Sequence, residues 1–137
     1  MLLAGLVACQ QGPEIVTSIV FDGESRSITS RKVTCTKQFD GSLVILAQDS
    51  PMHSVRITLS QQGRLVVQKV GLRYEGMAGY VADPREVTAT KVDDTFTFDG
   101  RMPPNEGESQ WHIFKIQTSC PGYVDAPPPK SPGLGAP

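Results

Sequence analysis

The sequence predicts an all-β protein, an antiparallel β-sandwich or a strongly curved sheet, with one disulfide and a disordered, proline-rich C-terminal tail. Three observations carry this prediction. Apolar and polar residues alternate with a period of two in several segments, which is typical of half-buried antiparallel strands. Asp-Gly and related turn sequences separate these segments. Glycine or proline interrupts most windows that are long enough for a helix.

Length and composition are those of one ordinary folded domain. The chain has 137 residues, of which 39% are hydrophobic and 20% charged, and its formal net charge is −1. A chain of this size buries roughly two thirds of its unfolded surface, so it can fold as a monomer without a metal or cofactor. Near-neutral charge lacks the electrostatic footprint of a nucleic-acid-binding protein. We expect one β-domain over residues 15–120 and no nucleic-acid partner.

The strands are predicted where the alternation is clearest. Val55, Ile57 and Leu59 alternate with polar neighbours, and Phe96 and Phe98 lie between threonines. The apolar run of residues 43–46 is continuous, which indicates a strand that could be buried on both faces. Strands are expected near residues 16–21, 27–36, 42–48, 55–60, 64–70, 86–92, 95–99 and 114–120. Short strands with turns every ~8 to 12 residues favour a sandwich or a curved sheet.

Turn sequences occupy the gaps between these segments. Phe-Asp-Gly occurs at residues 21–23, 39–41 and 98–100. Each copy is predicted to be a hairpin turn, because glycine accepts a positive φ and the aspartate carboxylate bonds to nearby backbone. We also expect a turn at residues 61–63, longer loops at 49–51 and 102–107, a solvated turn at 93–94 and a flexible loop at 71–79. The segment 121–137 is expected to be disordered or polyproline-like.

The first cysteine has the sequence context of a lipid attachment site. An apolar stretch ends in Leu6-Val7-Ala8-Cys9, which looks like a bacterial lipobox, where the cysteine thiol takes a diacylglycerol. Residues 1–9 would then be a truncated lipoprotein signal, shorter than the ~15 to 30 residues of a usual secretory signal, and 10–14 a polar tether. The alternative is a fraying apolar N-terminus in which Cys9 is a buried or free thiol.

The two remaining cysteines are candidates for a disulfide. If Cys9 is lipidated, Cys35 and Cys120 are left to pair, which requires an oxidising, extracytoplasmic compartment. A bond between them would join an early strand to the last one. In the chain-entropy model a loop of that length contributes roughly 4 to 5 kcal/mol.

A series of short motifs resembles a known family. In order and approximate spacing, the series resembles the mycobacterial 19-kilodalton lipoprotein antigen family over about residues 15–120 plus the lipobox. The motifs are Val20-Phe21-Asp22-Gly23, Val33-Thr34-Cys35, Val70-Gly71-Leu72, Ala89-Thr90-Lys91 and Phe114-Lys115-Ile116-Gln117-Thr118-Ser119-Cys120.

The resemblance implies a lipidated, surface-exposed protein, anchored in the cell membrane on its extracytoplasmic side. It implies acylation of Cys9, a disulfide between Cys35 and Cys120, host-cell adhesion and recognition by innate receptors of the Toll-like type. Two departures stand out. The family's Ser/Thr/Ala-rich stalk is reduced here to residues 10–14, without serine or threonine, which weighs against glycosylation and adhesin behaviour. The proline-rich tail is extra.

Catalytic chemistry finds little support in the residues. Catalysis needs a nucleophile with a base, or a metal cluster. His53 and His112 are far apart in sequence, and no histidine or cysteine pair has the spacing of zinc ligands. His112 is interpreted as an edge or surface imidazole, and Asp93-Asp94 lacks the spacing of a calcium loop. We expect a non-enzymatic protein without metal or cofactor.

Two functions therefore remain. The first is a lipid-anchored envelope protein, a surface antigen or interaction domain for host receptors or cell-wall components. The second is an extracytoplasmic carrier whose sheet encloses an apolar ligand such as a lipid. The two differ in what the aromatic residues do, since these would line a pocket in a carrier and fill a core otherwise. The residues concerned are Phe21, Phe39, Phe96, Phe98, Trp111 and Phe114.

Overall fold

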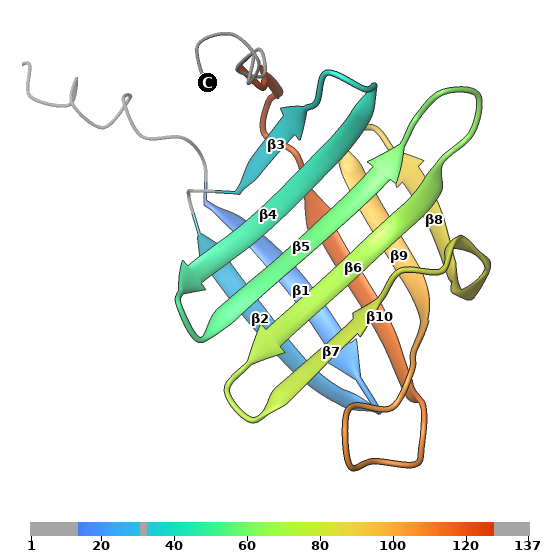
Figure 1. Ribbon diagram of the computed structural model, residues 1–137. Coiled ribbons are helices and arrows are strands. Elements are labelled where there is room, and N and C mark those ends of the chain that lie inside the picture. Colours follow the sequence, from blue (N-terminus) through green and yellow to red (C-terminus); the bar gives the residue numbers. More distant parts are fainter. Residues whose placement is uncertain (1–13, 31–32, 128–137) are drawn as a thin grey trace, which may run out of the picture.

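The computed structural model describes residues 14–30 and 33–127, which form two packed β-sheets (Figure 1). The first sheet has the strand order β2-β1-β10-β9-β8 and the second β11-β3-β4-β5-β6-β7. The strands are β1 (Ile15–Phe21), β2 (Glu24–Ser30), β3 (Thr34–Lys37), β4 (Ser42–Ser50), β5 (His53–Ser60), β6 (Val66–Tyr74), β7 (Met77–Val81), β8 (Val87–Val92), β9 (Thr95–Met102), β10 (His112–Ser119) and β11 (Val124–Asp125). A single 3-10 turn, η2 (Pro84–Glu86), precedes β8. The β-sandwich prediction is confirmed.

The period-two pattern places one face of each strand in the core. In β5, Val55, Ile57 and Leu59 are fully buried, whereas Arg56 between them is exposed. Antiparallel pairing to β4 and β6 keeps the inward residues in register, with Ile57 opposite Ile45 and Val70. Among the described residues, no helix is long or apolar enough to cross a membrane.

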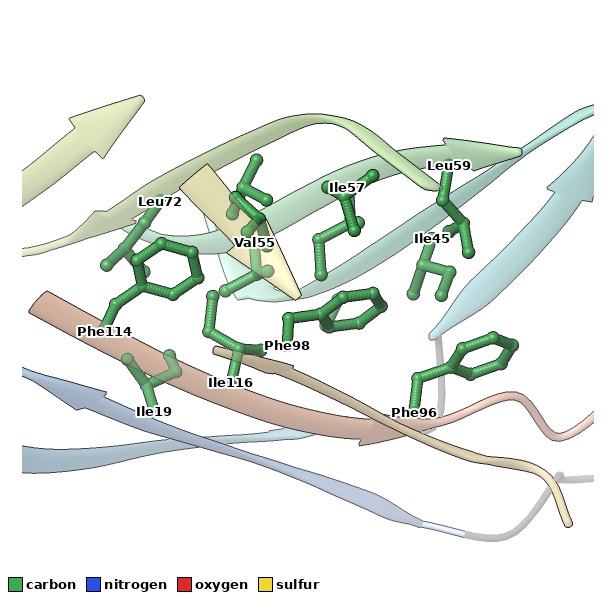
Figure 2. Close-up of a cluster of buried hydrophobic side chains, with 14 of the residues drawn as sticks. Ile19, Ile45, Val55, Ile57, Leu59, Leu72, Phe96, Phe98, Phe114 and Ile116 are labelled. Atoms are coloured by element: carbon green, nitrogen blue, oxygen red, sulfur yellow. The ribbon is translucent and has the colours of Figure 1, made fainter. Parts of the chain in front are cut away.

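Aromatic and branched side chains fill the space between the sheets (Figure 2). Phe96 and Phe98 project from β9 and Ile116 from β10, and all three are fully buried. They face the inward aliphatic residues of β4, β5 and β6 across the interior. Burying each such side chain contributes roughly 1.5 to 3 kcal/mol. Thr17 and Thr118 are also buried, and their hydroxyls hydrogen-bond to each other at 2.7 Å, so neither lacks a partner.

The predicted strand at residues 27–36 is wrong as a single element. β2 ends at Ser30 and pairs with β1, whereas β3 begins at Thr34 and pairs with β4 in the other sheet. Alternation continues across the crossover, because both strands turn an apolar face to the same core. The hydrophobic pattern therefore does not reveal the change of sheet. The run 43–46 is buried on one face, with Val44 and Leu46 only half-buried.

Two of the three Phe-Asp-Gly copies are turns, as predicted. Asp22 and Gly23 both have positive φ, 52° and 86°, between β1 and β2, and Gly41 has a φ of 91° before β4. The third prediction is wrong, because Asp99 and Gly100 lie inside β9. Gly100 is needed there for a different reason. A Cβ on it would collide with the backbone of Glu86, so glycine permits close approach of the segment before β8.

The glycine-containing segment 71–79 is ordered, against the prediction of a flexible loop. It forms the end of β6, the start of β7 and a tight turn in which Glu75 has a φ of 51°. Gly71 pairs with Tyr80, and the turn is tied back when the Glu75 N–H donates to the Met52 carbonyl at 3.0 Å. The glycines fit a hairpin, not a loop.

The tail begins later than predicted. Val124 and Asp125 form β11, which pairs in parallel with Thr36 and Lys37 of β3. The Ala126 N–H donates to the Lys37 carbonyl at 2.8 Å. Extended backbone beside an open sheet edge adds a short strand even where proline is frequent. Residues 128–137, and with them the rest of the predicted tail, lie outside the described residues.

Candidate functional site

The disulfide joins the two sheets. Cys35 lies on β3 and Cys120 follows β10, with a Cα–Cα distance of 5.8 Å and both side chains buried. Cys120 is also held by its N–H, which donates to the Asp94 carbonyl at 2.9 Å. The pairing confirms the prediction for these two cysteines. Cys9, the predicted lipidation site, lies outside the described residues.

The opposite end of the sandwich collects polar chemistry. We call it the turn end: the β1–β2, β4–β5 and β6–β7 turns and the β9–β10 loop, at the bottom of Figure 1. His112, at the start of β10, lies between two carboxylates from different segments. Its Nδ1 is 2.6 Å from Asp22 Oδ2, and its Nε2 is 2.7 Å from Glu108 Oε1. The ring stacks on Phe21 with centroids 4.8 Å apart.

This geometry specifies the charge of His112. A carboxylate can only accept hydrogen bonds, so both ring nitrogens must donate, as they do in imidazolium. Hydrogen bonds to Asp22 and then to Glu108 raise the pKa of His112 against the opposing effect of burial. Burial raises the pKa of Asp22, but hydrogen bonds from His112 and from the Ile113 N–H outweigh it, so the net shift is downward. The hydrogen bond from His112 lowers the pKa of Glu108.

A second histidine at the turn end is held in the same way. His53 Nδ1 lies 2.9 Å from Asp49 Oδ1, and its Nε2 lies 2.8 Å from Glu75 Oε2. Its ring stacks on Tyr74 at a centroid distance of 3.9 Å. The hydrogen bond to Glu75 raises the pKa of His53, opposed by desolvation and assisted by Asp49. Each histidine therefore clamps a turn to a distant segment.

A sequence signal for both clamps existed and was not used. Asp49 precedes His53 by four positions, and Glu108 precedes His112 by four. The interpretation of His112 as an isolated edge imidazole missed this shared spacing. The second carboxylates, Glu75 and Asp22, come from distant hairpins and carry no local signal.

The His112 clamp forms one wall of a small cavity of about 220 Å³. Three segments of the turn end meet in it: the β1–β2 turn, the β6–β7 turn and the β9–β10 loop. Its lining is Phe21, Asp22, Glu24, Gly76, Met77, Ala78, Asn105, Glu108 and His112. The Asn105 amide donates to the Ala78 carbonyl at 2.8 Å, which fixes the loop against β7. The cavity combines an apolar floor with an acidic rim.

These groups do not form catalytic machinery. Both nitrogens of each histidine are engaged by carboxylates, so neither histidine is a free base next to a nucleophile. Across residues 14–30 and 33–127, no group of three or more His, Cys, Asp or Glu residues could hold a metal ion. The arrangement stabilises turns and presents a shaped, charged surface.

The six aromatic residues proposed for a pocket do not come together. Phe21, Phe96, Phe98 and Phe114 are buried in the core. Phe39 is 70% exposed beside the β3–β4 turn, and Trp111 is 42% exposed. The guanidinium of Arg101 lies 4.1 Å from the centre of the Trp111 ring. Four of the six therefore fill the core, and two lie on the surface.

Comparison with known proteins adds one finding. Residues 10–120 match the family model described as Mycobacterium 19 kDa lipoprotein antigen. The matched region contains both disulfide cysteines and both histidine clamps. A comparison with curated proteins found no match.

Proposed function

The chain belongs to the Mycobacterium 19 kDa lipoprotein antigen family, and from this premise we propose that it is a lipid-anchored protein of the cell envelope. An acylated Cys9 holds it to the extracytoplasmic face of the cell membrane. The β-sandwich is a non-enzymatic domain displayed for interaction with host innate receptors or cell-wall components. Residues 10–14 form the tether.

The observation that carries the proposal is the disulfide between the sheets. Cys35 and Cys120 are buried and bonded to each other. Disulfides of this structural kind persist in oxidising compartments and are rare in the cytosol. The domain therefore suits the extracytoplasmic side of the membrane, which is also where lipobox processing would leave it.

The direction of β1 supports an orientation for the displayed domain. The strand starts at Ile15, next to the tether, and ends at Phe21, in the wall of the His112 cavity. A strand rises ~3.3 Å per residue, so the seven residues of β1 separate its two ends by roughly 20 Å. In an anchored protein the turn end would point away from the membrane. Its two histidine clamps and acidic cavity are then the surface offered to partners.

The packing of the core favours display over lipid carriage. Phe96 and Phe98 are fully buried and face the aliphatic residues of the other sheet (Figure 2). A carrier would leave such an interior unfilled. A charge at Phe98 would then be buried without a partner and should unfold the domain.

The test is the membrane attachment of the native protein. The protein should partition into detergent, with a mass increase on the peptide that begins at Cys9. Each buried methylene contributes ~0.8 kcal/mol, and two or more acyl chains anchor stably. Cys9→Ser should release the protein into the aqueous phase with an unchanged melting temperature.

Two controls keep this test sharp. Cys35→Ser with Cys120→Ser removes two thiols but should leave the protein in the detergent phase, since these cysteines lie inside the domain. Native mass spectrometry of the Cys9→Ser protein addresses the carrier alternative. A Cys9→Ser protein that stays in the membrane refutes the anchor, and a co-purifying lipid favours carriage.

A further inference from the structure

The outer face of the second sheet carries an unusual distribution of charge. Val55, Ile57 and Leu59 point into the core, so Arg56 and Thr58 on β5 point outward. Pairing then aligns Arg56 with Gly71, Thr58 with Lys69 and Ser54 with Arg73. Arg56, Lys69 and Arg73 are all exposed on this face.

These three cations have no counter-charge beside them. The uncharged outward positions of β4 to β7 are Val44, Leu46, Gln48, Ser54, Thr58, Ser60, Gly71, Ala78 and Tyr80. In the part of the chain that the structure describes, the arginines in ion pairs are Arg26, Arg85 and Arg101, and all three lie elsewhere. On a chain of net charge −1, a face whose charges are all positive calls for a ligand that is negative.

The cations surround a depression with a defined floor and wall. It has a volume of about 350 Å³ and is lined by Arg56, Thr58, Lys69, Gly71 and Tyr80. Gly71 forms the floor between Arg56 and Tyr80, which flank it on the neighbouring strands. The Tyr80 side chain is 54% exposed. A flat aromatic face beside a side-chain-free floor leaves room for a ring.

We propose that this depression binds an anionic saccharide, a sugar ring that carries a phosphate or carboxylate group. Arg56 and Lys69 supply the charge-assisted hydrogen bonds that such groups accept, with the guanidinium able to bind in bidentate fashion. Tyr80 supplies an apolar ring face with a polar hydroxyl, and Thr58 adds a further hydroxyl. The volume fits the lower range of small-molecule sites, ~300 to 1,000 Å³. The proposal does not depend on the lipid anchor.

Two other anionic partners fit the face less well. Nucleic acid is recognised by an extended basic stripe that contacts many phosphates, whereas this site has three cations in one small area. An anionic bilayer is a flat array of charges that attracts juxtamembrane basic segments, and it would make no use of a recessed glycine floor. The recess and the single aromatic wall favour a discrete ring.

The test is an NMR titration of the full chain with Cys9→Ser and the disulfide intact, so the outcome is separate from that of the anchor. The probes are mannose 6-phosphate, galacturonic acid oligomers, neutral mannose and inorganic phosphate. Charged sugars should shift the amides of Gly71, Tyr80 and their neighbours, and binding should weaken as salt rises. Neutral mannose should shift none of them, and inorganic phosphate should bind more weakly than the phosphorylated sugar.

Variants assign the binding to this site. Arg56→Gln and Lys69→Gln should each weaken binding about tenfold or more, since each loses a charged hydrogen-bond partner. Gly71→Ala should weaken it by filling the floor while the fold is kept, because the new Cβ would lie 3.7 Å from Tyr80 Cδ1, an ordinary contact distance. Lys115→Gln, on the outer face of the other sheet opposite Asp99, is the matched control and should bind like the parent.

Several results would overturn the proposal. These are an absence of shifts at millimolar charged sugar, equal binding of neutral mannose, or equal binding of inorganic phosphate and mannose 6-phosphate. Binding to phosphatidylglycerol vesicles without binding to free sugars would make the face a membrane surface instead. Loss of binding in Lys115→Gln as large as that in Lys69→Gln would place the site elsewhere.

Discussion

At His112 and His53, protonation is tied to folding. Each imidazolium donates to two carboxylates, and each carboxylate pair joins segments that are distant in sequence, as Asp22 and His112 are. A neutral ring could donate through one nitrogen only, so deprotonation breaks one of the two contacts. The clamps are therefore stable only while the rings are charged and the carboxylates ionised.

The pH dependence follows from the direction of each shift. A raised histidine pKa adds stability that is fully present below its ordinary value of 6.5 and is lost as the pH rises through the folded value. A lowered pKa at Glu108 adds stability that is present above 4.5 and is lost as the pH falls through the folded value. The clamps should thus contribute most between these two ordinary values, in mildly acidic solution.

We predict that the urea midpoint falls when the pH is raised from about 5.5 to about 8.5, across the titration of histidine. In the variant with both His53→Gln and His112→Gln, this part of the pH dependence should disappear. His112→Gln alone should remove only its own share, because the two clamps contain different residues. If the double variant keeps the full slope of the parent, the clamps do not govern it.

In the strands, glycine has two distinct roles. Gly100 lies within β9, where it pairs with Val87 of β8 and Phe114 of β10. The backbone of Glu86 lies so close that a Cβ would also be only 2.9 Å from Val87 Cα. Gly76, in the β6–β7 turn, has nothing within 4 Å of the same added atom. One glycine is required by packing, and the other is not.

Gly100→Ala should therefore destabilise the domain by roughly 1 to 3 kcal/mol, since backbone would have to move to make room for the methyl group. Gly76→Ala is the matched control and should change stability by less than about 1 kcal/mol. Urea unfolding of both variants followed by tryptophan fluorescence of Trp111 measures the difference. Equal midpoints for the two variants would contradict the packing argument.

Across the whole molecule, the disulfide links elements that no turn connects. Cys35 and Cys120 are 85 positions apart in sequence and belong to opposite sheets. Without the bond, the sheets are held together by the shared core and by the chain crossovers. The bond restricts the unfolded chain more than it changes the folded one.

Reduction should lower the free energy of unfolding by ~2 to 5 kcal/mol, as is typical of native disulfides in small secreted domains. The measurement compares urea unfolding of the oxidised protein with that of the Cys35→Ser, Cys120→Ser variant. Val44→Ala, at a half-buried outward position of β4, serves as a control for a change that does not cross the sheets and should cost less. Equal stability of the oxidised protein and the double variant would show that the bond adds nothing.

Local patterns in the chain were sufficient for the fold class, the inward face of strands such as β5 and β9, two of the Phe-Asp-Gly turns and the cysteine pairing. Periodicity and turn chemistry are properties of neighbouring residues, so they are readable without coordinates. The change of sheet between β2 and β3, the strand position of Gly100, the hairpin at residues 71–79 and the pairing of β11 were not readable in this way. Each depends on which strand lies alongside, and alternation is the same whichever partner is chosen. The histidine clamps and the cationic depression belong with these, because Asp22 meets His112, and Arg56 meets Tyr80 across Gly71, only when distant strands are in register.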